Sequence, residues 1–326
     1  MKRFEIAQAA SLAQAAKQAA TDGVVVKAGG VDLMDLMKEH LLEPDRLVSI
    51  QRVSGAREIR EEGGAIVIGP TVTLAELAAH PIVQAKAKAV AHAAGDAATP
   101  QIRHQATCAG NLLQRPRCWY FRKEDLVCRR KGGPECMAIE GENRYHALWH
   151  NTQCAIVHPS NLAPALMLFD ASVRTVRASG EKREVPLAKL FVTPEVDVHR
   201  EHCLEQDEVI EAIVLPSRDG GAASEYRELR EKQTFDWPLV SAAVRLAMDG
   251  KRVKEARVVL GAVCPVPLRR EAAEKSLAGK ELNEAVASQA AAAAFADAAP
   301  LSQNGYKVPA GTAHLARTIL AAGGMG

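Results

Sequence analysis

The chain has 326 residues, of which 48% are apolar and only 4% are aromatic. Its formal net charge of +2 gives no overall attraction to nucleic acid or to an anionic membrane surface. We expect no membrane insertion, because no stretch approaches the roughly 20 apolar residues that a spanning helix requires. The length suits two or three folded units, and the heavy use of alanine favours numerous helices.

The first fifty residues predict a small unit of strands and helices. Ser11 is a suitable N-cap for an alanine-rich helix, and Asp22-Gly23 is a suitable stop for it. Residues 24–27 (VVVK) are rich in β-branched side chains and predict a short strand. Polar residues interrupt the first twenty positions where a signal peptide has an apolar run, so we expect no export signal.

A glycine-containing turn, AGGVDL at residues 28–33, follows the predicted strand directly. Gly29 and Gly30 allow the backbone to approach a ligand closely, and Asp32 is placed to cap the helix that follows. Such a turn can direct several backbone N–H groups at an anion, although a plain tight turn fits the same residues. The sequence contains neither GxGxxG after a strand nor GxxxxGK[ST], so a nucleotide site here needs another architecture.

The next hundred residues predict further short elements. Residues 65–69 (AIVIG) predict a strand, and Thr73 with Glu76 predicts a capping box on the helix that follows. Pro81 then precedes a predicted long amphipathic helix at about 82–95. In QATCAGNLLQ (105–114), small and polar side chains are suited either to a phosphate contact or to an ordinary β-turn.

Five of the seven cysteines lie between positions 102 and 161. Four of them follow one another in a loop-like, arginine-rich segment that has little hydrophobic periodicity: Cys118, Cys128, Cys136 and Cys154. Nine, seven and seventeen residues separate them, so the C-x₂-C pairs of structural zinc sites are missing. A locally clustered, odd set of cysteines also argues against a disulfide framework.

The four cysteines therefore favour an iron–sulfur cluster, with four unrelated reduced thiols as the alternative. Residues 115–131 carry seven Lys or Arg and two Asp or Glu, and these cations could neutralise a cluster or form a solvated or partner-binding face. His146, His150 and His158 are nearby alternative ligands.

The remaining sequence predicts a strand, a turn and a helix at 155–169, with Ser160 or Asn161 as the helix cap. A half-buried strand is predicted at 172–178, and a domain boundary near 216–223. Asp249-Gly250 predicts a β-hairpin. Three helices are then predicted, at about 269–278, 282–297 and 310–322.

Several motifs in fixed order resemble the FAD-binding medium subunit of the xanthine dehydrogenase family of molybdenum hydroxylases. In the first two thirds of the chain they are AGGVDL (28–33), IGPTVTLAEL (68–77), IRHQATCAGNLLQ (102–114) and HPSNLAPAL (158–166). In the last third they are FDWPLVSAA (235–243), GAVCPVPLRREAAEKSLAGK (261–280) and PLSQNGYKVP (300–309). The resemblance covers nearly the whole chain, and the joint order of the motifs is more specific than any one of them.

The resemblance implies an α+β chain with a PCMH-type FAD-binding domain of two subdomains, followed by a C-terminal domain with a small antiparallel sheet and helices. The expected domains are 1–218, with subdomains at about 1–55 and 56–218, and 223–326. The residues expected to bind FAD, by position in the motifs, are Lys27, Ala28, Gly29, Gly30, Val31, Asp32, Leu33, Thr107, Gly110, Asn111, Ser160 and Asn161.

Five positions depart from the family pattern. Val31 replaces a threonine of the phosphate turn, and Cys108-Ala109 replaces Ile-Gly in the second motif, which makes Cys108 a packing residue rather than a fifth ligand. Asn161 replaces an aspartate near the flavin, so a negative charge is lost while hydrogen bonding remains possible. Glu228 stands where the family has a lysine.

The cysteine spacing resembles the subgroup whose flavin subunit carries an additional [4Fe–4S] cluster, as in periplasmic aldehyde oxidoreductases. The cluster loop is expected at about 115–157, with Cys118, Cys128, Cys136 and Cys154 as ligands.

The resemblance implies an electron-transfer subunit with no catalytic residue for substrate. Its implied partners are a molybdenum-cofactor large subunit and a [2Fe–2S] small subunit, in a heterotrimer or larger complex without nucleic acid. The cytoplasm is the expected compartment, or the periplasm if a signal-bearing partner carries the chain out. The alternatives are a self-contained flavin oxidoreductase, a zinc-stabilised binding module and an adapter that has lost its flavin.

Overall fold

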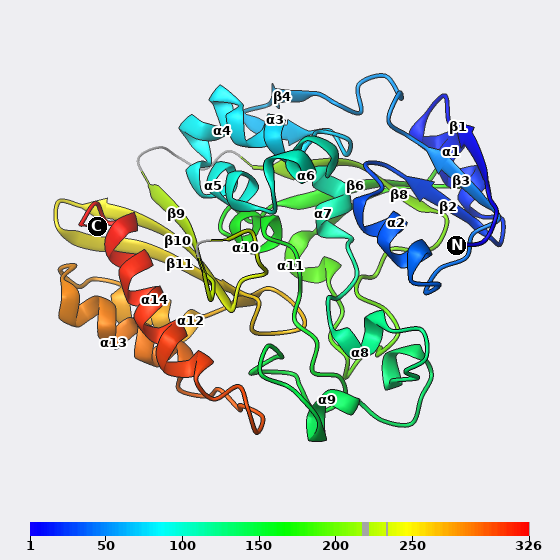
Figure 1. Cartoon of the computed structure of the whole chain (residues 1–326). Coiled ribbons are helices and arrows are strands. Elements are labelled where there is room, and N and C mark those ends of the chain that lie inside the picture. Colours follow the sequence, from blue (N-terminus) through cyan, green and yellow to red (C-terminus); the bar gives the residue numbers. More distant parts are fainter. Residues whose placement is uncertain (217–221, 233, 326) are drawn as a thin grey trace.

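The computed structural model describes residues 1–216, 222–232 and 234–325. In these residues the strands form three sheets, which lie side by side across the molecule with helices packed against them (Figure 1). The N-terminal sheet lies at one end and the C-terminal sheet with its helices at the other. The segment that contains the four cysteines extends from one side of the middle unit.

The N-terminal sheet has three parallel strands in the order β1-β3-β2. Ser11 accepts a hydrogen bond from the Gln14 backbone N–H, so the predicted cap of α1 is confirmed. The alanines of α1 and the valines of the strands form a small core together with Val176 and Val209 of the middle sheet. The elements are β1 (Glu5–Gln8), α1 (Leu12–Ala19), β2 (Val24–Lys27), α2 (Val31–Lys38) and β3 (Arg46–Ser49).

The middle sheet has five antiparallel strands in the order β4-β5-β8-β6-β7. Helices α3 to α7, α10 and α11 belong to the same unit, and the largest core lies between them and the sheet. The strands are β4 (Ile59–Glu62), β5 (Ala65–Ile68), β6 (Ser172–Arg177), β7 (Lys182–Pro186) and β8 (Glu208–Leu215). The helices are α3 (Leu74–Ala79), α4 (Pro81–Lys86), α5 (Lys88–Asp96), α6 (Pro100–Gln105), α7 (Cys108–Leu112), α10 (Leu162–Met167) and α11 (Leu187–Leu190).

The cysteine segment contains only three short helices, α8 (Trp119–Arg122), η1 (Arg129–Lys131) and α9 (Met137–Glu140). Phe121 and Cys128 are buried against Leu36 of α2, which gives this segment a small apolar core. The cysteine segment therefore packs on the helix that follows the glycine turn, although the two are far apart in sequence.

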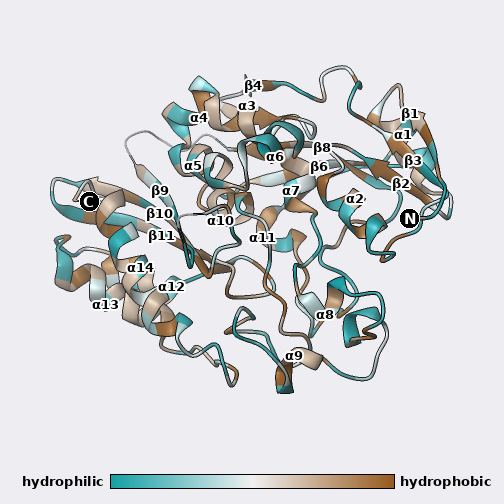
Figure 2. Ribbon diagram, viewed as in Figure 1, coloured by the Kyte–Doolittle hydropathy of each residue, from teal (hydrophilic) through white to brown (hydrophobic). Residues whose placement is uncertain are grey.

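The C-terminal unit is an antiparallel sheet in the order β12-β11-β10-β9, covered by α12, α13 and α14. The alanines of α13 give much of its ribbon a pale colour in Figure 2, and one face of this helix is buried in the C-terminal core. Its elements are β9 (Ala223–Leu229), β10 (Val240–Asp249), β11 (Arg252–Gly261), β12 (Leu268–Arg269), α12 (Glu271–Leu277), α13 (Glu284–Phe295) and α14 (Lys307–Ala322).

The predicted mixture of helix and sheet is confirmed, as are the capping box of α3 and the hairpin at Asp249-Gly250. Two predictions were wrong. Residues 155–158 form no strand, and the helix expected at 82–95 is two helices, because Ala87 has φ −144° and ψ 53° between them. The predicted boundary at 216–223 falls mostly outside the described residues.

Candidate functional site

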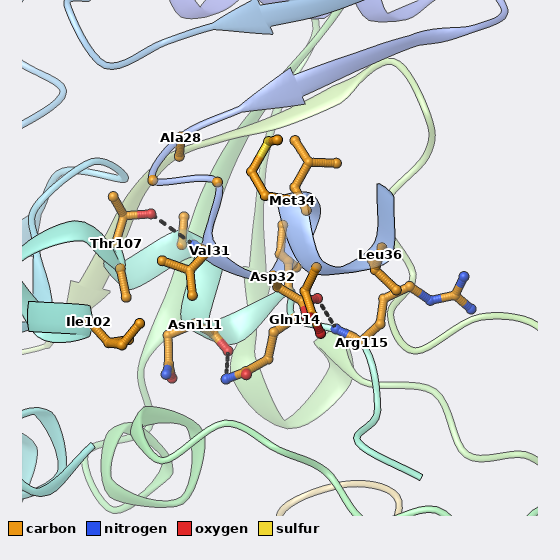
Figure 3. A pocket seen from close by; sticks show the side chains of 18 of the residues that line it. Ala28, Val31, Asp32, Met34, Leu36, Ile102, Thr107, Asn111, Gln114 and Arg115 are labelled. Carbon is orange, nitrogen blue, oxygen red and sulfur yellow. Dashed lines mark hydrogen bonds between the residues drawn. The ribbon is translucent and has the colours of Figure 1, made fainter. Parts of the chain in front are cut away.

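A cavity of about 680 Å³ lies where the N-terminal and middle units meet. This volume is within the range of sites that bind cofactors. Its walls come from the turn before α2, the first turn of α7 and the start of α10, as Figure 3 shows for the first two. It contains eleven of the twelve residues expected to bind FAD: Lys27, Ala28, Gly29, Gly30, Val31, Asp32, Leu33, Thr107, Gly110, Asn111 and Asn161.

The glycine turn requires its glycines. Gly30 is the N-cap of α2 with φ of 81°, in the left-handed region. A Cβ on Gly29 would lie 2.1 Å from the carbonyl oxygen of Gln105, which is closer than atoms can approach. The Gln105 side chain also donates a 2.6 Å hydrogen bond to the Gly29 carbonyl. The turn is therefore held closely against the chain that leads into α7.

The start of α7 and the start of α10 are joined by hydrogen bonds. Thr107 caps α7 by accepting from the Gly110 N–H at 3.3 Å (Figure 3). The Asn111 Oδ1 accepts from the Ser160 hydroxyl at 2.6 Å and from the Leu162 N–H at 3.3 Å. Ser160 also accepts from the Ala163 N–H at 3.0 Å, which fulfils its predicted capping role.

Ser160 does not line the main cavity. Together with Asn161 it lines a neighbouring cavity of about 30 Å³. The Ser160 residue is 4% exposed, and its hydroxyl donates a hydrogen bond to Asn111. Ser160 therefore lies behind the cavity wall. Ser160 thus fixes the orientation of the Asn111 carboxamide.

Asp32 has a different role from the one predicted. Gly30 occupies the N-cap, and the Asp32 carboxylate instead points toward the cysteine segment. It accepts a 2.8 Å hydrogen bond from the Arg115 N–H (Figure 3) and lies 2.8 Å from Arg117 and from Arg122. Asp35, one turn later, pairs with the same two guanidinium groups at 3.3 and 2.9 Å.

The arginines therefore serve mainly to attach the cysteine segment to its neighbours. Arg115 and Arg130 both pair with Glu201, at 3.0 and 2.8 Å. The contact with Cys136 and burial raise the pKa of the Cys154 thiol, and the charge of Arg130 opposes that rise. The sequence left two interpretations of the basic run, neutralisation of a cluster and a solvated or partner-binding face. Arg115, Arg117 and Arg122 instead pair with carboxylates of this chain.

The four clustered cysteines line one small cavity of about 10 Å³. Cys128 and Cys154 are buried, and Cys118 and Cys136 are partly buried. A hydrogen bond from Cys154 lowers the pKa of Cys136 to about 6, and the same contact raises the pKa of Cys154. Burial raises the pKa of Cys118 to about 12.

In the part of the chain that the structure describes, no group of three or more His, Cys, Asp or Glu is arranged to hold a metal ion. The histidines weighed as alternative ligands differ in position. His146 Nε2 lies 3.2 Å from Cys118 Sγ, whereas His150 pairs with Glu195 and His158 packs on a phenylalanine ring. The four cysteines would have to move apart to admit a cluster, because about 10 Å³ holds no more than one water.

Sequence reasoning missed several residues of the cavity wall. Arg230, Phe235 and Trp237 line it, and Phe235 and Trp237 are 56% and 49% exposed. Arg117 lies over the Trp237 ring, 4.8 Å from its centroid. In the sequence, these aromatic residues belong to the run FDWP (235–238). Two aromatic residues beside a proline are the signal that could have located this wall.

Comparisons with known proteins assign the chain to a family. Residues 2–218 match the FAD binding domain in molybdopterin dehydrogenase, and residues 224–321 match the CO dehydrogenase flavoprotein C-terminal domain. The aldehyde oxidoreductase FAD-binding subunit PaoB of Escherichia coli is 35% identical over 315 residues, which are 94% of each chain. The carbon monoxide dehydrogenase medium chain of Hydrogenophaga pseudoflava is 29% identical over 84% of this chain and 78% of that one.

Solved structures agree with this assignment. A carbon monoxide dehydrogenase structure from Hydrogenophaga pseudoflava has a TM-score of 0.77 at 27% identity, covering 99% of this chain and 98% of that one. Quinoline 2-oxidoreductase from Pseudomonas putida shares the fold, with a TM-score of 0.79 at 23% identity over 100% and 99%. The chain belongs to the family of FAD-binding medium subunits of molybdenum hydroxylases, and it is an oxidoreductase subunit.

Proposed function

We propose that this chain holds FAD in the 680 Å³ cavity and transfers electrons within a complex whose partners oxidise the substrate. The observation that carries the proposal is the convergence of three separate segments on one cavity of suitable volume. The residues proposed to contact FAD are Lys27, Ala28, Gly29, Gly30, Val31, Asp32, Leu33, Thr107, Gly110, Asn111 and Asn161, with Ser160 behind them.

FAD supplies the redox chemistry when it is bound, and the protein supplies position and electrostatics. The turn around Gly29 brings backbone N–H groups and the start of α2 to one wall, which suits a pyrophosphate. Asn111 and Asn161 bring carboxamides to other parts of the wall. Lys27 adds a cation whose pKa is lowered by burial and whose amine reaches the Ala28 carbonyl at 3.2 Å.

The partners proposed are a large subunit with the molybdenum cofactor and a small subunit with [2Fe–2S] clusters. Support comes from the relatives, which are named as subunits or medium chains. No helix in the described part of the chain is long and apolar enough to cross a membrane. We propose 1–218 and 223–326 as the two domains. The compartment proposed is the cytoplasm, or the periplasm if a partner carries the signal.

We also propose that Cys118, Cys128, Cys136 and Cys154 bind a [4Fe–4S] cluster in the 115–157 loop. Support comes from the four thiols around one cavity and from the lack of any C-x₂-C spacing. The ligands of a four-iron cube stand farther apart than those of a single ion, because the cube lies between them. The loop contains only short helices, so its conformation can adjust to the cluster.

Metal analysis and an absorption spectrum of the purified complex test both proposals. We expect FAD and about four irons per chain beyond those of the partners. Cys128→Ser should lose this iron, whereas Cys203→Ser, a matched change at a cysteine outside the loop, should keep it. Zinc without iron, or full iron content in Cys128→Ser, would refute the cluster.

The rival functions predict different results. A self-contained flavin oxidoreductase predicts reduction of its flavin by substrate without any partner. A zinc-stabilised module predicts zinc and no flavin, with salt-sensitive nucleic-acid binding. An adapter that has lost its cofactor predicts a colourless chain that binds no added FAD.

A further inference from the structure

Glu228 on β9 lies directly behind the cavity wall. Its side chain is 2% exposed and carries hydrogen bonds to both carboxylate oxygens. Oε1 accepts from the Asn161 Nδ2 and from the Tyr226 hydroxyl, the latter at 2.6 Å. Oε2 accepts from the Arg230 guanidinium, with the Nε at 2.9 Å. Asn161 and Arg230 both line the cavity, whereas Glu228 does not.

These contacts fix the orientation of the Asn161 carboxamide. A carboxylate only accepts hydrogen bonds, so the Asn161 amide nitrogen must face Glu228. The Asn161 carbonyl oxygen then remains as a neutral acceptor for a ligand in the cavity. Glu228 engages one of the two Nδ2 hydrogens, and the carboxamide carries no charge.

Arg230 is fixed by the same carboxylate. Its guanidinium also donates to the Asp96 carbonyl at 2.6 Å and to the Thr234 carbonyl at 3.1 Å. Its side chain is 17% exposed, so its charge is screened only in part by solvent. Glu228 balances this charge from the side away from the cavity.

Two of the positions that depart from the family pattern, Asn161 and Glu228, thus contact each other. Here the negative charge stands at position 228, and the cation that meets it is Arg230. The Asn161 carboxamide, the Glu228 carboxylate and the Arg230 guanidinium therefore form one hydrogen-bonded group.

We propose that Glu228 is a positioning residue for the flavin: it orients Asn161 as a neutral acceptor and offsets the charge of Arg230 at the cavity wall. This inference rests on the proposed placement of FAD in the cavity. Removing the Glu228 charge leaves Arg230 unbalanced, which favours the more electron-rich reduced flavin. Moving the charge to position 161 puts it on the cavity side and favours the oxidised flavin.

Redox titration of the flavin in the full-length chain, purified with its partners, tests this inference. Glu228→Gln should raise the preference for reduced over oxidised FAD about tenfold, which is about 30 mV for a two-electron couple. In the exchange variant, Asn161→Asp with Glu228→Gln, the carboxylate and the carboxamide change places. The variant still has one of each, and its net charge is unchanged. It should retain FAD, and its flavin potential should lie below that of the wild-type chain.

Glu225→Gln is the matched control. Glu225 is on the same strand, has a side chain that is 10% exposed and pairs with Lys88 and His92, but it does not line the cavity. It should leave the flavin potential unchanged. If Glu228→Gln fails to fold, the exchange variant decides alone.

The outcomes separate the inference from the function on which it rests. A wild-type chain that neither contains nor takes up FAD overturns the proposed function. If the wild-type chain binds FAD and the exchange variant has the wild-type flavin potential, the inference alone is overturned. The exchange would restore a pair whose role is merely structural. An equal shift in Glu225→Gln overturns it too, since the effect would then not depend on Asn161 and Arg230.

Discussion

The attachment of the cysteine segment to α2 should depend on Asp32 far more than on Asp35. Both carboxylates pair with Arg117 and Arg122, but the Asp32 side chain is 15% exposed and the Asp35 side chain 49%. Asp32 also accepts from the Arg115 backbone N–H at 2.8 Å. The two positions therefore form a matched pair that differs in burial and in one hydrogen bond.

We expect Asp32→Asn to lower the free energy of unfolding by about 2–3 kcal/mol. A hydrogen bond to a charged group contributes about 1.5–3 kcal/mol, and asparagine keeps one acceptor oxygen but directs an amide N–H toward an arginine. Removing one partner of a fully buried ion pair costs about 3–5 kcal/mol, and the partial exposure here reduces that figure. Asp35→Asn should cost less than about 1 kcal/mol, as exposed pairs do.

The measurement is urea-induced unfolding of the two variants and the wild-type chain under one set of conditions, together with limited trypsin digestion. The arginine-rich loop at 115–157 should be cleaved faster in Asp32→Asn than in Asp35→Asn. Equal losses in the two variants, or an Asp32→Asn variant within about 0.5 kcal/mol of wild type, would show that the network does not attach the segment.

Two further outcomes are expected. Gly29→Ala places a Cβ 2.1 Å from the Gln105 carbonyl oxygen and should weaken FAD binding by about 1–3 kcal/mol in a fluorescence titration. Gly305 has open space around it, so Gly305→Ala should bind FAD normally. Equal affinities of the two variants for FAD would contradict the close approach. Burial lowers the pKa of Lys307 to about 7, while the unfolded value is about 10.4. At pH values between these two pKa values, Lys307 is protonated in the unfolded chain and neutral in the folded chain. Its contribution to the free energy of unfolding therefore increases as the pH rises. In denaturant unfolding from pH 7 to 10, the free energy of unfolding of Lys307→Met should increase less with pH than that of the wild-type chain. An unchanged pH dependence would refute this role of Lys307.

Local rules predicted local structure well. The capping box of Thr73 and Glu76, the cap at Ser11 and the hairpin at Asp249-Gly250 depend on residues within four positions of one another. The same rules assigned Asp32 to a helix cap, because its partners could not be seen. Arg115, Arg117 and Arg122 are 83 to 90 positions away, and only the tertiary structure brings them to Asp32.

Local pattern suggested the glycine turn and residues 105–114 separately as anion contacts, and the resemblance predicted that they belong to one site. Nothing within residues 28–33 indicates that Thr107 or Asn161 faces them, because that proximity requires the middle sheet and α10 to be in place. The same reason accounts for the residues that were missed. Arg230 and Trp237 lie on the connection between β9 and β10, which reaches the cavity from the C-terminal unit.

The cysteine segment is joined to the cavity in three independent ways. The segment begins shortly after Asn111 and ends shortly before Ser160, and the side chains of these two residues are hydrogen-bonded at 2.6 Å. Its arginines pair with Asp32, which follows the glycine turn on α2. Its small core includes Leu36 of the same helix. The loop that contains the four cysteines and the turn that lines the cavity therefore contact the same short helix, α2.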